Sequence, residues 1–468
     1  MIKNLEQTLA SLPPEWPEDL LPRIQAEHAG NPRSIVVLDD DPTGCQTVHD
    51  VPIVTEWSLE SIKNEFRRET PLFYILTNSR TLQPRAAEAL AKKIGKRLKQ
   101  ASASTGRRFV VITRSDSTLR GHYPVEVVAL ANALNENDAI QVLVPFFLEG
   151  GRYTLDDVHY VAEGDQLIPA GETAFARDAS FSYHASDLKE WVAEKTNGAI
   201  SVDSVTSLTL TEVRQGGPAG VAEKLSQILP GGVCVVNAAS MRDLEVVTLG
   251  LLTAEKQNQR FIFRTAASFV RAFAGLAPKP LLTAADLNLP ASGGALFVVG
   301  SYVPRSTTQL NHLLEHTSIK RIEINVERLL SARGRAGEIK RVVLEAEAAL
   351  KRNLDIVLYT SRELITGGNA ADSLDIVSRV SQGIVQIVKR IRSRPRYVLA
   401  KGGITASDIA TKSFGLKRAI VPGQILPGVP VYRFGLKSKF PGLTYVVFPG
   451  NVGGPDALTS LLTSLKAE

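Results

Sequence analysis

The sequence predicts an α/β fold made of two α/β domains, each with a mainly parallel sheet flanked by helices. Three observations support this prediction. The chain has 468 residues, which is too long for one ordinary core. Short apolar runs alternate with helical patterns, as parallel strands joined by crossover helices require. A Pro-, Gly- and Ala-rich segment at 276–294 interrupts this alternation. We therefore predict an N-terminal appendage (1–33), a first domain (34–280) and a second domain (281–468).

The first domain follows a polar, Pro-rich appendage. Its first predicted strands are Ile35–Leu38, Leu72–Leu76, Phe109–Ile112 and Ile140–Val144, with helical patterns over 85–100 and 124–136. Residues 150–200 lack a clear period, so we expect a long irregular stretch there, either binding loops or a disordered connection. The α/β pattern resumes at Val202 and over 231–240, and helical segments follow over about 241–274.

The second domain repeats the alternation. Its predicted strands are Ala295–Val299, Ile319–Ile324, Asp355–Tyr359 and Tyr397–Ala400, with helical patterns over 326–352 and 370–392. Short β-like runs follow over 419–434 and 443–450, and a helix is predicted over 455–466. The chain contains no internal repeat and no low-complexity tract.

Composition excludes several classes of function. Net charge is +6, and no Lys/Arg block is interleaved with aromatic residues, so nucleic-acid binding is not expected. No segment reaches the roughly 18 apolar residues of a membrane span, so no membrane association is expected. The two cysteines, Cys45 and Cys234, have no zinc-site or disulfide spacing, which favours a reducing, cytoplasmic location.

Polar and charged side chains follow the predicted strands of the first domain. Ligands of open α/β sheets bind beyond the carboxyl ends of strands, so these residues are candidates for a binding site. They are Asp40, Asp41, Thr43 and Gly44; Thr77, Asn78 and Ser79; Arg114, Asp116, Ser117, Thr118 and Arg120; and Pro145, Phe146, Glu149, Gly151 and Arg152.

Carboxylates combined with guanidinium groups suit a small anionic polyol. Arginine grips a carboxylate through two parallel N–H bonds, and aspartate accepts hydrogen bonds from hydroxyl groups. An aspartate placed there could also serve as a general base. For the segment at 114–121 alone, the alternative is an N-capped helix with Asp116 or Ser117 as the cap.

The second domain carries three glycine-bearing turns between strand and helix. The first contains Gly300 and Ser301, the second runs through Gly402, Gly403, Ile404 and Thr405, and the third contains Gly450, Asn451 and Gly453. Such turns let backbone N–H groups approach a phosphate, although a Gly pair alone is as often only a tight turn. Together they indicate a nucleotide pocket, and phosphoryl transfer to an anionic polyol follows as the economical hypothesis.

Seven blocks of the chain resemble, in order, those of the four-carbon acid sugar kinase family. They are DDPTGC (40–45), SDSTLRG (115–121), VPFFLEGGR (144–152), VVGSYVP (298–304), KGGITASDI (401–409), PGVPVYRF (427–434) and PGNVGG (449–454). The resemblance spans roughly residues 34–462, and its most specific element is D-S-T-L-R-G downstream of D-D-x-T-G.

The resemblance implies a sugar-acid domain followed by a nucleotide domain, with the active site in the cleft between them. ATP, with Mg²⁺, would phosphorylate a hydroxyl of a tetronate such as threonate, erythronate or an oxo-tetronate. The resemblance places Asp40, Asp41, Asp116, Ser117 and Arg120 at the sugar-acid site, to which Thr43, Gly44, Arg114 and Arg152 are added from their strand-end positions. Ser301 and the Gly402–Thr405 and Gly450–Gly453 turns would hold ATP. Asp41 and Asp116 are the candidate bases, unranked, and a homodimer is implied.

Several positions depart from the family's motifs. Pro42 and Cys45 replace Leu and Ala, Ile404 replaces Glu, and Phe448 replaces Lys. Two alternatives therefore stay open, namely a metal-dependent hydrolase or lyase acting on a sugar acid, and a non-catalytic sensor of sugar acids and nucleotides. No metal-ligand set is assigned. Asp39, outside the motif, is expected to be a solvated neighbour of Asp40 and Asp41.

Overall fold

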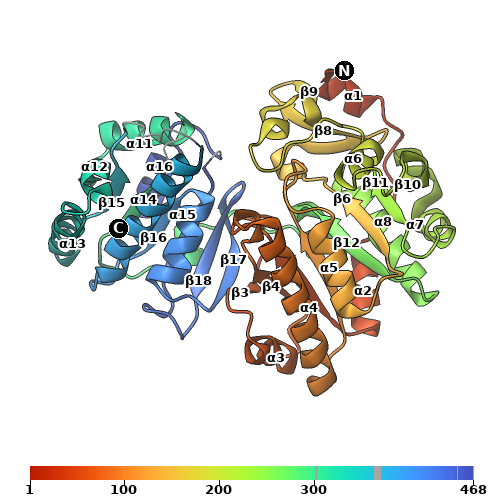
Figure 1. Cartoon of the computed structure of the whole chain (residues 1–468), viewed down its shortest axis with the longest axis horizontal. Helices are drawn as coiled ribbons and strands as arrows, with labels where there is room; N and C mark the ends of the chain where they lie inside the picture. Colours follow the sequence, from red (N-terminus) through yellow and green to blue (C-terminus); the bar gives the residue numbers. More distant parts are fainter. Residues whose placement is uncertain (301–303, 363–369, 451, 467–468) are drawn as a thin grey trace. The chain divides into compact units, whose positions relative to one another are not determined.

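The computed structural model describes residues 1–300, 304–362, 370–450 and 452–466. The chain forms two compact units, Met1–Val48 with Glu56–Pro278, and His49–Thr55 with Lys279–Glu468. Both units are α/β, with largely parallel main sheets, which confirms the predicted fold class (Figure 1). Within the described parts of the chain, no helix has the length and apolar character needed to cross a membrane.

The main sheet of the first unit has the strand order β10-β11-β6-β12-β5-β2-β4, and all neighbouring strands are parallel. Its strands are β2 (Ser34–Asp39), β4 (Leu72–Leu76), β5 (Phe109–Arg114), β6 (Ile140–Val144), β10 (Val205–Leu208), β11 (Val233–Val236) and β12 (Phe261–Thr265). Strand β2 is buried along its whole length, since helices cover both faces of such a sheet. Its carboxyl end therefore delivers Asp39 to the interior and the following residues to the sheet edge.

Helices of the first unit pack on this sheet in neighbouring pairs, with α4 beside α5 and α7 beside α8 (Figure 1). The helices of the first unit are α1 (Leu5–Ala10), α2 (Leu21–Gly30), α3 (Leu59–Arg67), α4 (Pro84–Thr105), α5 (Val125–Leu134), α6 (Leu188–Lys195), α7 (Leu210–Ser226), α8 (Met241–Lys256) and α9 (Ala267–Phe273). Helix α4 ends at Gly106, whose φ of 72° an L side chain rarely adopts. Helix α8 begins with a capping box between Ser240 and Asp243.

Two predictions for the first unit were wrong. The stretch 150–200 contains an antiparallel sheet of β7 (Arg152–Leu155), β8 (Val158–Glu163) and β9 (Gln166–Pro169). Its first hairpin turns at Asp156 and Asp157, both with positive φ, which is the geometry of a two-residue hairpin loop. The predicted helical region 241–274 also contains β12, a strand in the middle of the sheet.

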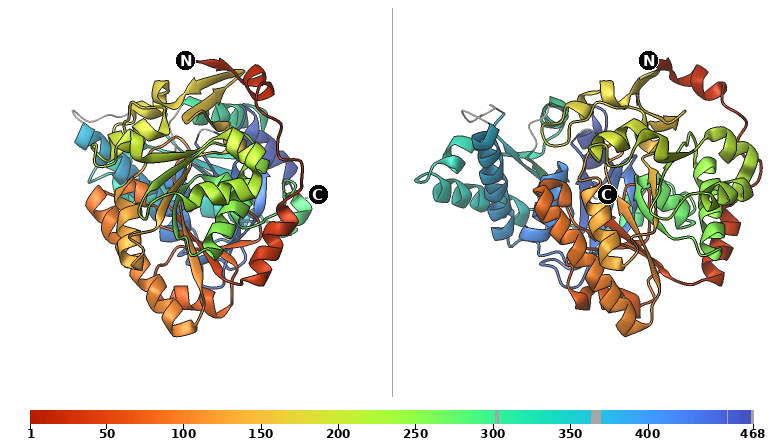
Figure 2. Two further views of the ribbon diagram at one scale, coloured as in Figure 1. Left: turned by 90° about the vertical axis from the view of Figure 1, so that its right-hand side faces the viewer. Right: turned by 45° about the vertical axis from the view of Figure 1, so that its right-hand side comes forward.

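Residues 1–33 are part of the first unit. Strand β1 (Lys3–Asn4) pairs with β9 in the small sheet, beside which the N-terminus lies in Figure 2. Helix α2 packs on α8. Trp16 covers Gly217, where a Cβ would come within 2.5 Å of the indole ring. The N-terminal segment therefore closes the hydrophobic surface left by α7 and α8.

The main sheet of the second unit has the order β3-β17-β18-β19-β16-β13-β15-β14. Strands β19, β16, β13, β15 and β14 are parallel, whereas β3, β17 and β18 pair antiparallel. They are β3 (Val51–Val54), β13 (Leu296–Val299), β14 (Lys320–Ile324), β15 (Ile356–Thr360), β16 (Val398–Lys401), β17 (Arg418–Leu426), β18 (Val429–Phe434) and β19 (Thr444–Phe448). The predicted strands of this region are confirmed, and β3, contributed by an earlier part of the chain, was not predicted.

The helices of the second unit are α10 (Ala284–Leu287), α11 (Pro304–His316), α12 (Val326–Leu330), α13 (Arg335–Lys351), α14 (Ala370–Arg390), α15 (Gly403–Asp408) and α16 (Ala457–Ser464). The single helical pattern predicted over 326–352 is two helices, because the chain turns at 331–334. Gly334 lies at this turn, where a Cβ would come within 2.9 Å of the Arg328 carbonyl oxygen. Helices α11 and α16 pack together against the β13 side of the sheet.

Candidate active site

Asp39, the last residue of β2, lies inside the first unit. It is 2% exposed and forms an ion pair with Arg114, 3.3 Å from Oδ1 to Nη1. Gly44 packs directly on it, and a Cβ at Gly44 would lie 2.1 Å from both Asp39 carboxylate oxygens. The prediction of a solvated Asp39 was therefore wrong, because the strand carries this residue under the turn. Burial raises the pKa of Asp39 to about 7, against the attraction of Arg114 and with added repulsion from Asp40.

Arg80 joins three carboxylates that come from two different segments. Its Nη2 is 2.6 Å from Asp40 Oδ1, and its Nη1 is 3.3 Å from Asp41 Oδ2 and 3.8 Å from Asp116 Oδ1. This guanidinium offsets the mutual repulsion of the carboxylates. Arg80 was not predicted, although it directly follows Ser79 in the strand-end segment after β4. Its position at a strand end is the signal that could have identified it.

Asp116 is held by donors on every side. Arg120 Nε lies 2.7 Å from its Oδ2, Thr118 Oγ1 donates to the same oxygen, and Arg80 faces Oδ1. Burial opposes ionisation, but these cations and the hydroxyl outweigh it and hold the pKa of Asp116 far below its usual range. The alternative of a helix cap is excluded, because α5 begins only at Val125 with Pro124 at its N-cap.

Asp41 is more accessible than Asp116. Its side chain is 23% exposed, against 13% for Asp116. Oδ1 of Asp41 accepts hydrogen bonds from the Thr43 amide, at 2.8 Å, and from the Thr43 hydroxyl. Burial alone would raise the pKa of Asp41, but Arg80, Arg114 and Thr43 outweigh this effect. The pKa of Asp41 is therefore lowered, and the carboxyl is ionised at neutral pH. Its second oxygen, Oδ2, lies 3.3 Å from Arg80 Nη1.

Arg120 and Arg152 share one aromatic neighbour. Their guanidinium carbons lie 5.1 and 5.6 Å from the centre of the Phe175 ring. Burial lowers the pKa of Arg152, with repulsion from Arg120 adding to this effect. The buried Nε of Arg152 has no hydrogen-bond partner within the structure. Two neighbouring guanidinium groups with spare donors can bind a carboxylate.

Ser117 belongs to the same segment as Asp116 and Arg120. Its carbonyl oxygen contacts Nε2 of His159, at 2.7 Å, and its side chain is nearly buried. His159 is fully buried, and burial lowers its pKa to about 4, so its imidazole is neutral. This histidine thus fixes the backbone of the 115–121 segment.

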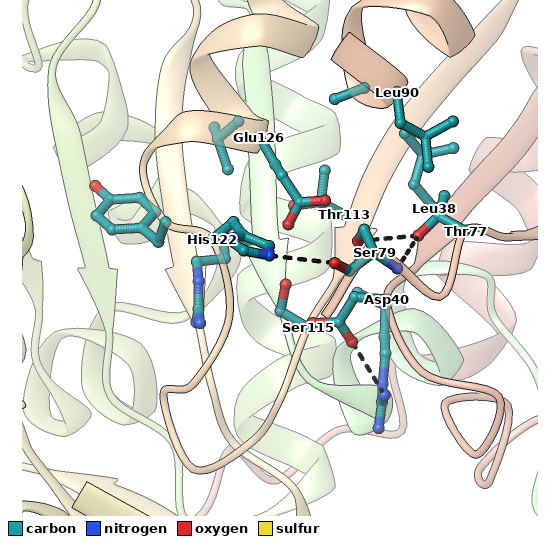
Figure 3. Close-up of a pocket in the computed structure, with 14 residues that line it drawn as sticks. Leu38, Asp40, Thr77, Ser79, Leu90, Thr113, Ser115, His122 and Glu126 are labelled. Carbon is teal, nitrogen blue, oxygen red and sulfur yellow. Dashed lines mark hydrogen bonds and ion pairs between the residues drawn. The ribbon is translucent and has the colours of Figure 1, made fainter. Parts of the chain in front are cut away.

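A small pocket lies behind Asp40, with a volume of about 20 Å³, enough for one water-sized group. Figure 3 shows Glu126 of α5 entering it beside His122 and Ser79. Burial raises the pKa of Glu126 from 4.5 to about 7, and repulsion from Asp40 adds to the shift. Arg264 also lines the pocket from β12, with Nη2 donating to the Arg120 carbonyl at 3.0 Å. Neither the pocket nor the role of Glu126 was predicted.

We expect Glu126→Gln to raise the stability of the protein, relative to wild type, by more at pH 8 than at pH 5. A carboxyl whose folded pKa lies above its unfolded value binds its proton more tightly in the native state, so stability falls as pH rises from about 4.5 to above 7. Glutamine removes this penalty. Urea unfolding should show the variant's stability relative to wild type rising by roughly 1–3 kcal/mol between pH 5 and pH 8. A difference independent of pH would contradict the shift.

The three glycine-bearing turns of the second unit start at one level of the sheet. Strands β13, β16 and β19 are adjacent, and Val299, Lys401 and Phe448 are paired in register at their carboxyl ends. The structure therefore brings these turns together. Of the predicted nucleotide-binding residues, Ser301 and Asn451 lie outside the described residues.

The second and third turns are joined by hydrogen bonds. Gly402, with φ of 108°, donates its amide to the Phe448 carbonyl at 2.8 Å. Gly450 accepts from Ser306 Oγ at 3.3 Å, and Gly453 accepts from Gln309 Nε2 at 3.1 Å. Helix α11 therefore fixes the third turn. The first turn adjoins the second, because a Cβ at Gly300 would lie 3.1 Å from Thr405 Oγ1. Gly403 and Ile404 open helix α15.

No group of three or more His, Cys, Asp or Glu side chains among the described residues could hold a metal ion. Asp40, Asp41 and Asp116 instead each contact an arginine. A divalent cation would therefore need phosphate oxygens to complete its coordination.

Comparisons with known proteins match different domain models to the two parts of the chain. A sugar-binding N-terminal domain model matches residues 35–273, and a nucleotide-binding C-terminal domain model matches residues 296–458. The chain is 26% identical over 217 residues to 3-oxo-isoapionate kinase of Paraburkholderia graminis, covering 44% of each chain. It is 26% identical over 385 residues to D-erythronate kinase of Heliobacterium modesticaldum, covering 76% of this chain and 80% of that kinase.

Solved structures show the same fold. A Haemophilus influenzae protein superposes with a TM-score of 0.64 at 16% identity, covering 92% of this chain and 100% of that chain. A Salmonella typhimurium protein superposes with a TM-score of 0.67 at 15% identity, covering 93% and 99%. The two domain models together match most of the chain, in the order that its motifs require. The chain belongs to the four-carbon acid sugar kinase family, a family of phosphotransferases that act on an alcohol group.

Proposed function

We propose that this protein is an ATP-dependent kinase that phosphorylates a hydroxyl of a tetronate-type sugar acid, such as threonate, erythronate or an oxo-tetronate. The observation that carries the proposal is the arrangement of Asp40, Asp41 and Asp116 around Arg80, at the strand ends of the domain that matches a sugar-binding model. The similarity to D-erythronate kinase supports the substrate class.

In this proposal Arg120 and Arg152 bind the carboxylate of the acid, since both guanidinium groups face Phe175. Asp40 accepts hydrogen bonds from its hydroxyl groups, and the Thr43 hydroxyl donates or accepts a further one. Arg114, Gly44 and Ser117 position these side chains, because Arg114 pairs with Asp39 and the other two pack beneath the site.

Asp41 is the proposed general base, ahead of Asp116. Proton acceptance requires a free carboxylate oxygen within reach of the reacting hydroxyl. Both oxygens of Asp116 face arginine, and one also accepts from Thr118, so this carboxylate is a weak base that holds Arg120 in place. Asp41 is more exposed, and its Oδ2 lies 3.3 Å from Arg80 Nη1, whereas Oδ2 of Asp116 lies 2.7 Å from Arg120 Nε.

The second unit would hold ATP through the Gly402–Thr405 and Gly450–Gly453 turns, with Ser301 as a further candidate. Backbone N–H groups in such turns bind phosphate oxygens. Mg²⁺, bound with the nucleotide phosphates, would neutralise part of their charge. Most of the rate would come from positioning and electrostatics rather than from covalent chemistry.

An ADP-release assay over a panel of sugar acids tests the proposal. We expect turnover that depends on ATP with at least one four-carbon acid, and weaker turnover with five- and six-carbon acids. Consumption of an acid without ATP would instead support a metal-dependent hydrolase or lyase. Binding of acid and nucleotide without ADP release would support a sensor. A cytoplasmic homodimer is proposed on the family resemblance, and light scattering of the purified protein tests the oligomeric state.

A further inference from the structure

Lys401 is a fully buried lysine at the centre of the three glycine-bearing turns. It is the last residue of β16, its relative exposure is 0%, and it directly precedes Gly402. Its register partners are Val299 on β13 and Phe448 on β19, the residues from which the other two turns begin. The fold therefore places Lys401 at the start of the second turn and beside the residues from which the other two turns begin.

The side chain of Lys401 is bound by neutral groups. Its Nζ donates to the Pro449 carbonyl at 2.8 Å and lies 3.4 Å from the Gly450 carbonyl oxygen. It also lies 4.1 Å from the centre of the Phe448 ring. In the described part of the chain, no carboxylate forms an ion pair with it. A buried cation without an anion is costly, so this environment suits a lysine that acquires an anionic partner.

The charged groups around Lys401 do not supply that partner. Arg305 on α11 faces it and repels it. Asp408 on α15 is engaged by Lys412, at 2.7 Å, and by Ser381. Arg362 donates to the Val299 carbonyl at the neighbouring strand end. Burial, together with repulsion from Arg305, lowers the pKa of Lys401 to about 7, so the group is partly neutral at physiological pH.

We propose that Lys401 is the buried cation of the nucleotide site, and that it binds the 449–450 carbonyl groups while attracting phosphate charge held by the surrounding turns. The inference rests on the proposed function, because it takes a nucleoside diphosphate or triphosphate as the ligand. The phosphate charge favours the ammonium form, so the neutral amine takes up one proton from solvent as the nucleotide binds. Adenosine, which has no phosphate, causes no such uptake.

Titration calorimetry of the full-length protein with ADP and with adenosine tests this proposal. At pH 8, measurements in two buffers of different ionisation enthalpy should show uptake approaching one proton per ADP by the wild type. Lys401→Met should weaken ADP binding by about 10- to 100-fold and abolish the uptake. Adenosine affinity should change less than threefold. Lys340→Met, which removes an exposed lysine of the same unit, is the control and should leave both affinities unchanged.

The outcomes separate this inference from the proposed function. If wild-type protein binds no ADP, the proposed nucleotide site itself fails. If it binds ADP without proton uptake, or if Lys401→Met loses ADP and adenosine equally, Lys401 is only a structural residue and the inference is overturned. The wild-type uptake measurement needs no variant, so it decides the question even if Lys401→Met does not fold.

Discussion

Replacement of Asp41 by asparagine should lower kcat for sugar-acid phosphorylation by about 10²- to 10⁴-fold, the range typical of a lost general base. Asparagine keeps an oxygen for the Thr43 amide and hydroxyl, which both bind Oδ1 of Asp41, but it cannot accept the substrate proton as a carboxylate does. Steady-state kinetics at saturating ATP should therefore show a large fall in kcat with KM for the acid changed by less than fivefold. Calorimetry should show unchanged ADP affinity.

Asp116→Asn provides the comparison that ranks the two carboxylates. It weakens the hold on Arg120, whose Nε lies 2.7 Å from the Asp116 carboxylate, so KM for the acid should rise by about tenfold or more. Asp138→Asn, at an exposed position outside the site, should leave both parameters unchanged. If Asp116→Asn lowers kcat more than Asp41→Asn does, the assignment of Asp41 as base is wrong.

Replacement of Arg80 by methionine should destabilise the protein by about 3–5 kcal/mol at pH 8, the cost typical of removing one partner from a buried ion pair. Methionine fills much of the same volume but leaves Asp40, Asp41 and Asp116 without the cation that they share. Urea unfolding at pH 8 measures the loss. Acid binding should also weaken, because the three carboxylates lose their fixed positions.

The penalty at Arg80 should shrink as the pH falls. Arg80 is among the groups that lower the pKa of Asp41 and Asp116. A carboxyl whose folded pKa is lowered stabilises the protein above its unfolded pKa, and this stabilisation is lost as the pH falls toward the folded pKa. The penalty should therefore persist at pH 5 and shrink only below about pH 4, where these carboxyls begin to take up protons in the unfolded chain. Arg67→Met, which breaks an exposed pair with Glu60, should cost less than about 1 kcal/mol. Equal effects of the two variants would contradict the central role of Arg80.

Much of the fold could be predicted from periodicity, because parallel strands covered on both faces must be continuously apolar. Strands β2, β4, β5 and β6 fall where these runs predicted them. Strand β12 was missed, because FIFRT carries a buried arginine and lies between two helices. Strands β7 to β9 were missed since their alternation is broken by the two-residue turn at Asp156 and Asp157.

The candidate site was predicted in part. The rule that ligands bind beyond the carboxyl ends of parallel strands selected Asp40, Asp41, Asp116 and Arg120, and the structure brings these four together with Arg80. Asp39 was misjudged because sequence spacing cannot show that the chain folds back and places Gly44 over its carboxylate. Glu126 was overlooked because a charged residue on a helix is usually solvated.

The sequence by itself determined the class of fold, the family and the segments that carry the chemistry, because these depend on local periodicity and on residues adjacent in the chain. Only the tertiary structure decided which charges share a partner. Arg80 meets Asp116 across a separation of 36 residues, and Lys401 lies beneath a turn nearly 50 residues away. Such contacts depend on strand order and register, which the spacing of residues along the chain does not encode. Burial at these contacts then sets how each group ionises.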